Sequence, residues 1–549
     1  MAQSINSGHQ IDDGLAEEAF RLLREDEIDQ LRGCGKEEEV EPGRFFFRPG
    51  ETVHDFCVML EGEIHFYDPH DQTAHDSYAG PGTLVGEIGL LTGLKAILAC
   101  EVTKPGRVLT ISREGLKEVI STVPEIAESI ITSFRARREM MMTTAANTLL
   151  IVGHEHSSEV QHIRQFAART RIPHRCVESD SEEGQQIIDK HGLQVDPVSV
   201  LVRSETVLEH PTNLDLARAV GADLAVQDSE LVDLLIIGGG PGGLAAAVYG
   251  ASEGLDTVVI EDTAIGGQAG TSSLIENYMG FPTGISGDGL TYKGQIQAIK
   301  FGARFAVPRR AISLACHDNY FSVGLDDDAC LKARSVILAC GVQYQKLPLE
   351  RINEFEGAGI YYAATDLEAR FCRDTEAYIV GGGNSAGQAA MFLTHYADHV
   401  HLLIRGDSLA SSMSEYLSQR LESNEDITIH THTEVEALHG DDCLEAITLR
   451  NNQSEQTEKK ETKGLFLMIG AKPFTNWLSD TLKLDKKGFV LTGSDADTSQ
   501  SRFATSAAGV FAIGDVRSGS VKRVASAVGE GSVVVSDVYQ FLKNQENGQ

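Results

Sequence analysis

The chain has 549 residues, and its 47 lysines and arginines are outnumbered by 80 aspartates and glutamates, which gives a formal net charge of −33 at pH 7. This acidic balance argues against nucleic acid and against an anionic membrane surface as partners. No apolar run approaches the ~20 residues of a membrane helix, and we expect no signal peptide. The nine cysteines are scattered and never in C-x-x-C spacing, which favours free thiols in a reducing cytoplasm. The length suggests three or four domains.

The first segment, residues 1–145, begins with an acidic helical stretch and continues as short β-like runs separated by glycines. Short strands with glycine turns predict a small β-roll. Apolar residues at spacings of three and four predict a helix over 114–139. A β-roll with flanking helices and the phrase GEIGLLTG at 86–93 resembles a cyclic nucleotide-binding domain.

That resemblance implies a nucleotide pocket made by Gly86, Glu87, Lys95 and Ala96. In the family the Glu binds the ribose hydroxyl and a later arginine pairs with the cyclic phosphate, and Lys95 stands at the arginine position. Lysine keeps the charge but loses the planar fork that holds a phosphate with two hydrogen bonds. Two interpretations stay open: weak binding of cyclic AMP or cyclic GMP, or a domain kept for packing. A DNA-binding helix-turn-helix is not expected, because the chain continues differently and is acidic.

The middle segment, residues 146–226, alternates predicted strands at 149–152, 174–178 and 198–202 with predicted helices at 158–169 and 182–190. This order, with a proline just before the third strand, resembles a small thioredoxin-like domain. That fold usually carries a dithiol after its first strand, where this chain reads GHEHSSEV without cysteine. No cysteine or carboxylate completes a metal set with the two histidines, so we expect no metal. We expect a redox-inert packing or docking module.

Residues 233–261 read as strand, glycine-rich turn, Ala-rich helix and second strand, the layout of a dinucleotide-binding unit. In G-x-G-x-x-G spacing the first glycine permits a tight turn, and the second lets backbone N–H groups approach a pyrophosphate. The third lets the helix pack close to the strand. An acid at the end of the second strand can accept hydrogen bonds from a ribose hydroxyl. The predicted site residues are Gly238, Gly240, Pro241, Gly242, Gly243 and Glu261.

Residues 377–406 repeat this layout, with Gly381, Gly383 and Ala386 in G-x-G-x-x-A spacing. Here the second strand ends at Arg405, which suits a ribose 2′-phosphate and therefore favours NADPH over NADH. Near the C-terminus another apolar strand runs into a Gly514–Asp515 turn. One dinucleotide fold inserted into another resembles the thioredoxin reductase group of pyridine nucleotide flavoproteins, and the resemblance covers 230–545.

The resemblance implies an α/β fold with an FAD-binding domain at 227–345 and 490–549, an NADPH-binding domain at 346–489, and a homodimer. A positive charge near the flavin ring, at Lys522 and Arg523, would stabilise the anionic reduced flavin. Cys340 stands where the family commonly has Thr. Further implied FAD contacts are Gly267, Gln268, Asn277, Cys340, Gly341, Gly514, Asp515 and Val516. Further implied NADPH contacts are Asn384, Ser385, Ile469 and Gly470.

The main departure from that group is its dithiol, which is normally a C-x-x-C followed by Asp. This chain reads GIYYAATD at 359–366, and the nearest thiol, Cys372, stands alone. Asp366 matches the Asp of the family and is a candidate proton donor. We therefore predict an FAD-dependent oxidoreductase that takes hydride from NADPH and passes electrons to an unidentified acceptor, with regulation by a cyclic nucleotide as a further hypothesis. The alternatives are a ferredoxin- or flavodoxin-NADP reductase and a non-enzymatic flavin or nucleotide sensor.

Overall fold

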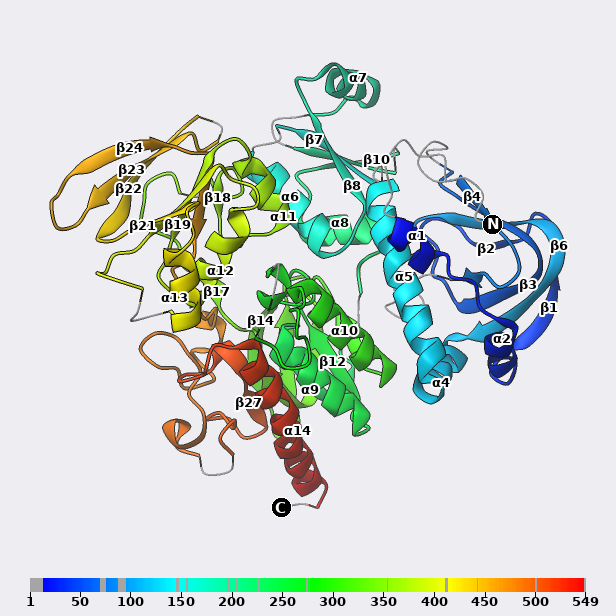
Figure 1. The fold of residues 1–549 in the computed structure, drawn as a ribbon. Helices are drawn as coiled ribbons and strands as arrows, with labels where there is room; N and C mark the ends of the chain where they lie inside the picture. Colours follow the sequence, from blue (N-terminus) through cyan, green and yellow to red (C-terminus); the bar gives the residue numbers. More distant parts are fainter. Residues whose placement is uncertain are drawn as a thin grey trace. The chain divides into compact units, whose positions relative to one another are not determined.

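The computed structural model describes most of the chain, and the chain divides into two compact units that are treated separately below (Figure 1). The first unit contains residues 1–153, 163–226 and 296–309, and the second contains 154–162, 227–295 and 310–549. The four predicted domain boundaries stay predictions. The described residues are 13–69, 76–86, 95–144, 148–154, 157–194, 198–203, 205–224, 228–272, 275, 277–352, 354–409, 413–441, 443–498 and 501–547.

The N-terminal part of the first unit is the predicted β-roll. Its strands pair antiparallel in the order β1-β6-β3-β4, with β2 on β6 and β5 on β3. The ring of Phe56 on β3 meets Phe134 on α5 edge-on at 6.0 Å between centroids, and both are fully buried. The core of the roll is therefore closed by α5. The elements are α1 (Asp13–Ala19), α2 (Glu25–Arg32), β1 (Lys36–Val40), β2 (Phe45–Phe47), β3 (Asp55–Tyr67), β4 (Asp76–Ala79), β5 (Leu84–Val85), β6 (Ala99–Ser112), α4 (Arg113–Thr122) and α5 (Pro124–Thr144).

The next part of the chain forms a four-stranded sheet in the order β10-β9-β7-β8. Strands β7 and β8 are parallel, whereas β9 is antiparallel to both β7 and β10. Helix α8 begins with a capping box at Thr212 and ends at Gly221 in the left-handed conformation that a C-cap requires. These elements agree with the predicted thioredoxin-like module: β7 (Leu149–Gly153), α6 (Ser158–Arg169), β8 (His174–Glu178), α7 (Glu182–His191), β9 (Ser199–Val202), β10 (Thr206–Glu209) and α8 (Asn213–Val220).

The second unit opens with the sheet that carries the first glycine turn. Strand β11 lies between β12 and β16 with parallel pairing, β27 is parallel to β16, and β14 and β15 extend the sheet antiparallel. The predicted strands and helix of the first dinucleotide fold are confirmed here. The elements of this part are β11 (Leu231–Ile237), α9 (Pro241–Ser252), β12 (Thr257–Ile260), β14 (Ala311–Cys316), β15 (Phe321–Leu325), β16 (Cys330–Leu338), β27 (Val510–Ala512) and α14 (Val524–Glu546). Helix α10 (Gly287–Lys300) begins in this unit, and its end and β13 (Arg304–Ala306) belong to the first.

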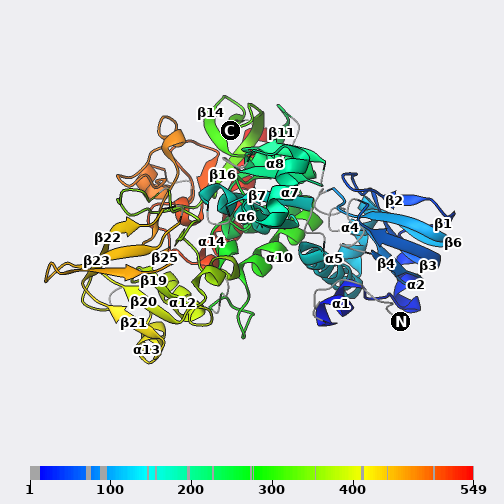
Figure 2. The same ribbon diagram turned by 90° about the horizontal axis from the view of Figure 1, so that it is seen from above.

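The inserted part of the second unit has a parallel sheet in the order β18-β25-β19-β20-β21. A three-stranded antiparallel sheet, β22-β23-β24, lies beside it in both views (Figures 1 and 2). Apolar side chains of the two sheets share one core. The elements are β18 (Ile360–Tyr361), α11 (Asp366–Ala369), β19 (Glu376–Val380), α12 (Asn384–Leu393), β20 (His399–Leu403), α13 (Glu415–Glu422), β21 (Ile427–His430), β22 (Thr433–His439), β23 (Ala446–Asn451), β24 (Thr457–Glu461) and β25 (Gly464–Leu467).

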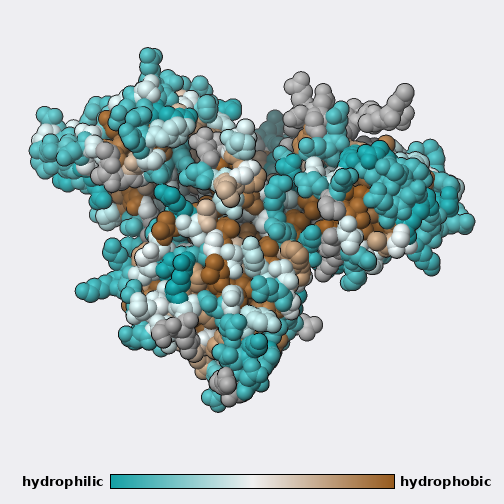
Figure 3. All heavy atoms as spheres, turned by 60° about the horizontal axis from the view of Figure 1, so that its bottom comes forward, coloured by the Kyte–Doolittle hydropathy of each residue, from teal (hydrophilic) through white to brown (hydrophobic). Residues whose placement is uncertain are grey.

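Two short strands connect the two sheets of the second unit. Strand β17 (Gln343–Tyr344) leaves the first sheet and pairs antiparallel with β26 (Ala471–Lys472), which returns from the second. The face of the molecule in Figure 3 is mostly hydrophilic, with apolar side chains in scattered groups. Among the described residues, no helix is both long enough and apolar enough to cross a bilayer.

Candidate dinucleotide and nucleotide sites

The first glycine turn joins β11 to α9 and can hold its shape only with glycine. A Cβ on Gly243 would lie 1.9 Å from the carbonyl oxygen of Gly238, and Gly238 itself has a φ of +113°. Gly240 is the N-cap of α9, and Pro241 begins the helix, where no backbone N–H is needed. The first-turn N–H groups of α9 have no partner within the helix. They form a site suited to a pyrophosphate.

Glu261 lies beneath this turn rather than in open solvent. Its side chain is buried, and one carboxylate oxygen accepts a hydrogen bond from the Gly239 N–H at 2.7 Å. The other oxygen accepts from the Thr263 N–H at 3.3 Å. The carboxylate therefore fixes the turn, and its position one residue beyond β12 is the one expected of a ribose ligand.

A second loop approaches the turn and contributes predicted FAD residues. A Cβ on Gly267 would lie 3.1 Å from the Cα of Gly240, so only a small residue fits there. The Gln268 side-chain amide donates a hydrogen bond to the Val342 carbonyl. Asn277, also predicted to bind FAD, is exposed.

Cys340 and Gly341 lie just beyond β16, after Ala339 and beside the first glycine turn. A Cβ on Gly238 would lie 2.7 Å from the Cys340 backbone nitrogen. Burial raises the pKa of the Cys340 thiol to about 12. The thiol therefore stays protonated near neutral pH and is a poor nucleophile.

The Gly514–Asp515 turn precedes α14, as predicted. The Gly514 N–H donates to a Glu530 carboxylate oxygen at 2.7 Å, and Arg517 pairs with the same carboxylate. Burial raises the pKa of Asp515, and the Lys522 ammonium opposes this shift. A half-buried carboxyl held beside a cation can accept hydrogen bonds from a polyhydroxy ligand.

The remaining predicted residues of this region differ in burial. Val516 is fully buried, whereas Lys522 and Arg523 are exposed. The Lys522 ammonium lies 4.6 Å from the centroid of the Phe489 ring. Arg523 is the N-cap residue of α14. Both cations are therefore at the start of the helix that follows the Asp515 turn.

The second glycine turn joins β19 to α12 and has alanine, Ala386, at the third position of its motif. A Cβ on Gly381 would lie 2.4 Å from the Met468 carbonyl oxygen, so the first position of this turn also requires glycine. Gly383 is the N-cap of α12, and the Asn384 side-chain oxygen accepts from the Ser414 N–H at 2.8 Å. Ser385 is exposed at the first turn of the helix. The N–H groups of α12 thus form a second anion site.

Arg405 lies just beyond β20 with its side chain exposed. Its carbonyl accepts a hydrogen bond from the Asn452 amide at 3.2 Å, which fixes the backbone and leaves the guanidinium outside. Ile469 packs against the core of this sheet, and the Gly470 carbonyl accepts from the Gln345 N–H at 2.9 Å. The predicted NADPH residues therefore lie at the ends of β20 and β25 and at the start of α12.

The segment that replaces the dithiol contains no accessible thiol. Asp366 is exposed at the start of α11 and accepts a hydrogen bond from the Tyr396 hydroxyl. Glu368, two residues on, is buried, and burial raises its pKa; it accepts from the Thr365 N–H at 3.1 Å as a helix cap. Cys372 is fully buried in the core, and burial raises its pKa to about 12.

An aromatic pair that the sequence does not reveal lies next to this segment. The rings of Tyr344 on β17 and Tyr362 stack at 5.6 Å with an interplanar angle of 12°. The Tyr362 hydroxyl donates to Glu356, and the Tyr344 hydroxyl lies 3.5 Å from that of Thr271. The pair packs the connecting strand β17 against the residue that follows β18. The two tyrosines are 18 positions apart in the sequence, so no local pattern predicts the contact.

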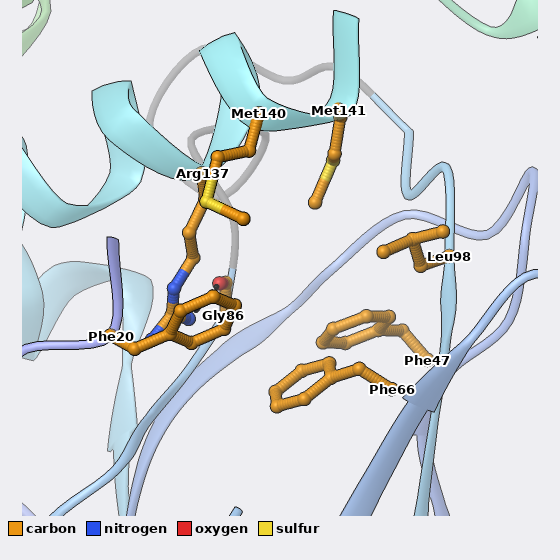
Figure 4. Close-up of a pocket in the computed structure, with 8 residues that line it drawn as sticks. All are labelled: Phe20, Phe47, Phe66, Gly86, Leu98, Arg137, Met140 and Met141. Atoms are coloured by element: carbon orange, nitrogen blue, oxygen red, sulfur yellow. Dashed lines mark hydrogen bonds between the residues drawn. The ribbon is translucent and has the colours of Figure 1, made fainter. Parts of the chain in front are cut away.

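In the β-roll, Arg137 of α5 reaches the loop that holds Gly86. Its guanidinium donates to the carbonyls of Ala19 at 2.8 Å, Leu84 at 2.7 Å and Gly86 at 3.4 Å. Figure 4 shows this side chain between Phe20 and Gly86. The sequence did contain a signal for this contact: Arg137 follows Phe134 by three residues, so a charged side chain lies on the apolar face of the helix.

A small apolar cavity of about 20 Å³, partly open to solvent, lies beside Arg137. Met140 and Met141 of α5 face Phe47 and Phe66 of the roll across it (Figure 4). The other lining residues are Phe20, Gly86, Leu98 and Arg137.

Of the other predicted residues of the nucleotide pocket, Lys95 and Ala96 differ in burial. Ala96 is fully buried, whereas Lys95 is exposed. Glu87 lies outside the described residues. In the part of the chain that the structure describes, no three His, Cys, Asp or Glu side chains are grouped to hold a metal ion.

Two glycine turns, each following a strand with parallel neighbours and leading into a helix N-terminus, are typical of a protein that binds two dinucleotides. The family model of pyridine nucleotide-disulphide oxidoreductases matches residues 232–531, and the cyclic nucleotide-binding domain model matches residues 37–123. The chain therefore belongs to the pyridine nucleotide-disulphide oxidoreductase family. Within that family it is an oxidoreductase of the thioredoxin reductase type.

Relatives and solved structures agree with this assignment. The thioredoxin reductase of Treponema pallidum is 31% identical over 315 residues, covering 57% of this chain and 98% of that protein. The thioredoxin reductase of Mycolicibacterium smegmatis is 33% identical over 316 residues, covering 57% and 97%. The crystal structure of Lactococcus lactis thioredoxin reductase in the FR conformation matches with a TM-score of 0.53 at 28% identity, covering 57% of this chain and 99% of that one.

Thioredoxin reductases use FAD and NADPH, and the residues present fit both groups. The first turn has the buried acid Glu261 one residue beyond β12, and Gly243 lets α9 pack closely on the turn, as in a dinucleotide site that holds FAD. The second turn has Arg405 in place of the acid, as a 2′-phosphate requires. The chain is thus a flavin oxidoreductase of the FAD- and NADPH-dependent type.

Proposed function

We propose that this oxidoreductase passes electrons from NADPH to an acceptor without using a dithiol of its own chain. The observation that carries the proposal is the segment 359–366, which has alanines and a threonine where thioredoxin reductases have their cysteines. Cys372, the nearest thiol, is fully buried and stays protonated, so it cannot attack an external disulphide. FAD, when bound, would supply the chemistry of accepting two electrons and releasing them.

The residues of this chain would bind and orient the two cofactors. The N–H groups at the start of α9 would hold the FAD pyrophosphate, Glu261 its ribose, and Asp515 its polyhydroxy chain. The N–H groups at the start of α12 and the Arg405 guanidinium would hold NADPH. Lys522 and Arg523 would place positive charge near the flavin, and Asp366 would carry a proton at the acceptor side.

The acceptor would reach the flavin at the face left open by the missing dithiol. The stacked pair Tyr344 and Tyr362 lies at this segment and offers an aromatic surface to a flat acceptor such as a quinone. A small iron–sulphur or flavin protein would be the alternative acceptor class. Stopped-flow oxidation of the NADPH-reduced holoenzyme by a quinone, a ferredoxin, a flavodoxin and a thioredoxin tests the proposal. Rapid oxidation by the thioredoxin alone would contradict it.

We also propose that the N-terminal domain binds a cyclic nucleotide weakly. The family model over 37–123 supports the fold for such a site. Loss of one of two charge-assisted hydrogen bonds at Lys95 weakens binding about tenfold or more relative to an arginine. Calorimetry with cyclic AMP and cyclic GMP on the wild type and on Lys95→Arg tests this. No heat with either protein would contradict it and favour a packing role.

A further inference from the structure

The segment that carries Lys95 directs this side chain out of the β-roll. Ala96 donates its N–H to the Glu51 carbonyl at 2.9 Å, and its own carbonyl accepts from the Gly50 N–H at 2.8 Å. Ala96 is fully buried, whereas the Lys95 side chain is exposed and therefore points out of the roll.

Outside the roll, the stem of Lys95 lies against the end of α8 in the thioredoxin-like module. The Lys95 N–H donates to the Gly221 carbonyl at 3.2 Å. A Cβ on Gly221 would lie 2.2 Å from the Cδ of Lys95 and 2.7 Å from its Cβ. The contact is therefore closely packed and involves both the backbone and the side chain of Lys95.

Two other contacts within the first unit join the same two parts of the chain. The Arg203 guanidinium covers Gly50, where a Cβ would lie 2.8 Å from Nη1, and it donates to the Val220 carbonyl at 3.3 Å. Arg138 of α5 donates to the Arg171 carbonyl at 2.8 Å. The last carbonyls of a helix have no partner within it, so Arg203 and Lys95 supply the donors that the end of α8 requires.

We propose that docking of the thioredoxin-like module and binding of a cyclic phosphate exclude one another, because both require Lys95. This inference rests on the nucleotide site proposed above. For its ammonium to reach a phosphate inside the roll, the Lys95 stem must leave Gly221, and the docking contact is then lost. The docked form is the form with low nucleotide affinity, and a bound nucleotide releases the module.

The apparent affinity of such a site falls in proportion to the fraction of the protein that is undocked. Weakening the docking contact must therefore tighten nucleotide binding, even though the altered residue lies outside the pocket. Gly221→Ala is the sharpest variant, because the added methyl group overlaps the Lys95 side chain. Gly192→Ala is its matched control: Gly192 ends α7 with a φ of +66°, close to the +75° of Gly221, but a Cβ there meets nothing within 4 Å.

The experiment measures two quantities on the full-length protein: the affinity for cyclic AMP and cyclic GMP by calorimetry, and the hydrogen exchange of the peptides that contain Lys95 and the end of α8. We expect Gly221→Ala to speed exchange at Lys95 and to tighten binding about fivefold or more. Gly192→Ala should change neither, and a saturating nucleotide should speed exchange at Lys95 in the wild type.

Faster exchange at Lys95 in Gly221→Ala with unchanged nucleotide affinity would overturn the inference and leave the nucleotide site standing. The absence of binding to the wild type, Gly221→Ala and Lys95→Arg would overturn the nucleotide proposal, and this inference with it. If Gly221→Ala does not fold, Arg203→Ala removes the neighbouring contact with Gly50 and gives the same test.

Discussion

The two dinucleotide folds of the second unit differ in the size of the residue at the third position of the glycine motif and in the burial of the charged residue after the second strand. In the first, a methyl group at Gly243 would lie 1.9 Å from a backbone carbonyl, and the acid Glu261 is buried and hydrogen-bonded to the turn. In the second, Ala386 occupies the equivalent position, and Arg405 is exposed. The acid of the first fold is enclosed by its turn, whereas the cation of the second lies at the surface. This difference fits a resident FAD and an exchanging NADPH.

The largest expected effect comes from giving the first turn the alanine that the second turn has at the third position of its motif. Gly243→Ala should lower the free energy of unfolding by about 3 kcal/mol or more and abolish FAD retention, because the helix must move away from the strand. Ala386→Gly is the matched control and should cost only about 1 kcal/mol through helix propensity. The ratio of flavin to protein absorbance and the melting temperature measure both variants. Normal FAD content in Gly243→Ala would show that the turn tolerates the methyl group.

The second test removes the charge that distinguishes the second turn. Arg405→Ala should weaken NADPH binding by about 1.5–3 kcal/mol, the range for a hydrogen bond to a charged group, and leave NADH almost unchanged. The dissociation constants of the two nucleotides, measured with the oxidised holoenzyme, give the comparison. Equal losses for both nucleotides would mean that Arg405 does not contact the 2′-phosphate.

The two folds should also differ in sensitivity to acid, because the second sheet carries a histidine cluster. His401 lies between His430 at 2.9 Å and Glu376 at 3.1 Å, and burial lowers its pKa to about 4. The unfolded chain binds this proton at a higher pH, so stability falls as the pH drops from about 6.5 towards 4. We expect a loss of about 1–2 kcal/mol between pH 7 and pH 5. His401→Gln should flatten the dependence of the melting temperature on pH; an unchanged slope would assign it to other groups.

The smallest expected effect concerns the lone thiol near the missing dithiol. Cys372→Ser should leave NADPH–ferricyanide turnover unchanged, because the thiol is buried and protonated. Its cost should appear only in stability, by about 1 kcal/mol, since a hydroxyl replaces a thiol in an apolar core. Steady-state turnover at matched FAD content measures the first effect. A large fall in turnover would give the thiol a catalytic part.

Much of the fold could be predicted because local patterns determine it. The strand at 257–260 and the helix that begins at Pro241 follow from an apolar run and from a glycine turn with proline at the first helical position. The β-roll and the inserted second dinucleotide fold were predicted for the same reason.

Contacts between distant segments could not be predicted. Nothing near Lys95 in the sequence indicates that its stem packs on Gly221, 126 residues later. Sequence motifs assigned Lys95 to a phosphate, but its direction depends on which face of the segment is buried. The stack of Tyr344 on Tyr362 likewise depends on how two sheets are joined. Such contacts arise from tertiary packing, which produces no periodic pattern in the sequence.

The proposal that electrons leave without a dithiol is tested most directly by counting the electrons that the protein accepts. An anaerobic titration of the oxidised holoenzyme with dithionite, followed by flavin absorbance, gives this number. A flavin and a redox-active dithiol each take up two electrons, so a dithiol enzyme requires about four per FAD. This chain should require about two per FAD, and Cys372→Ser should give the same value. A requirement of about four would contradict the account, because it would demonstrate a second redox centre.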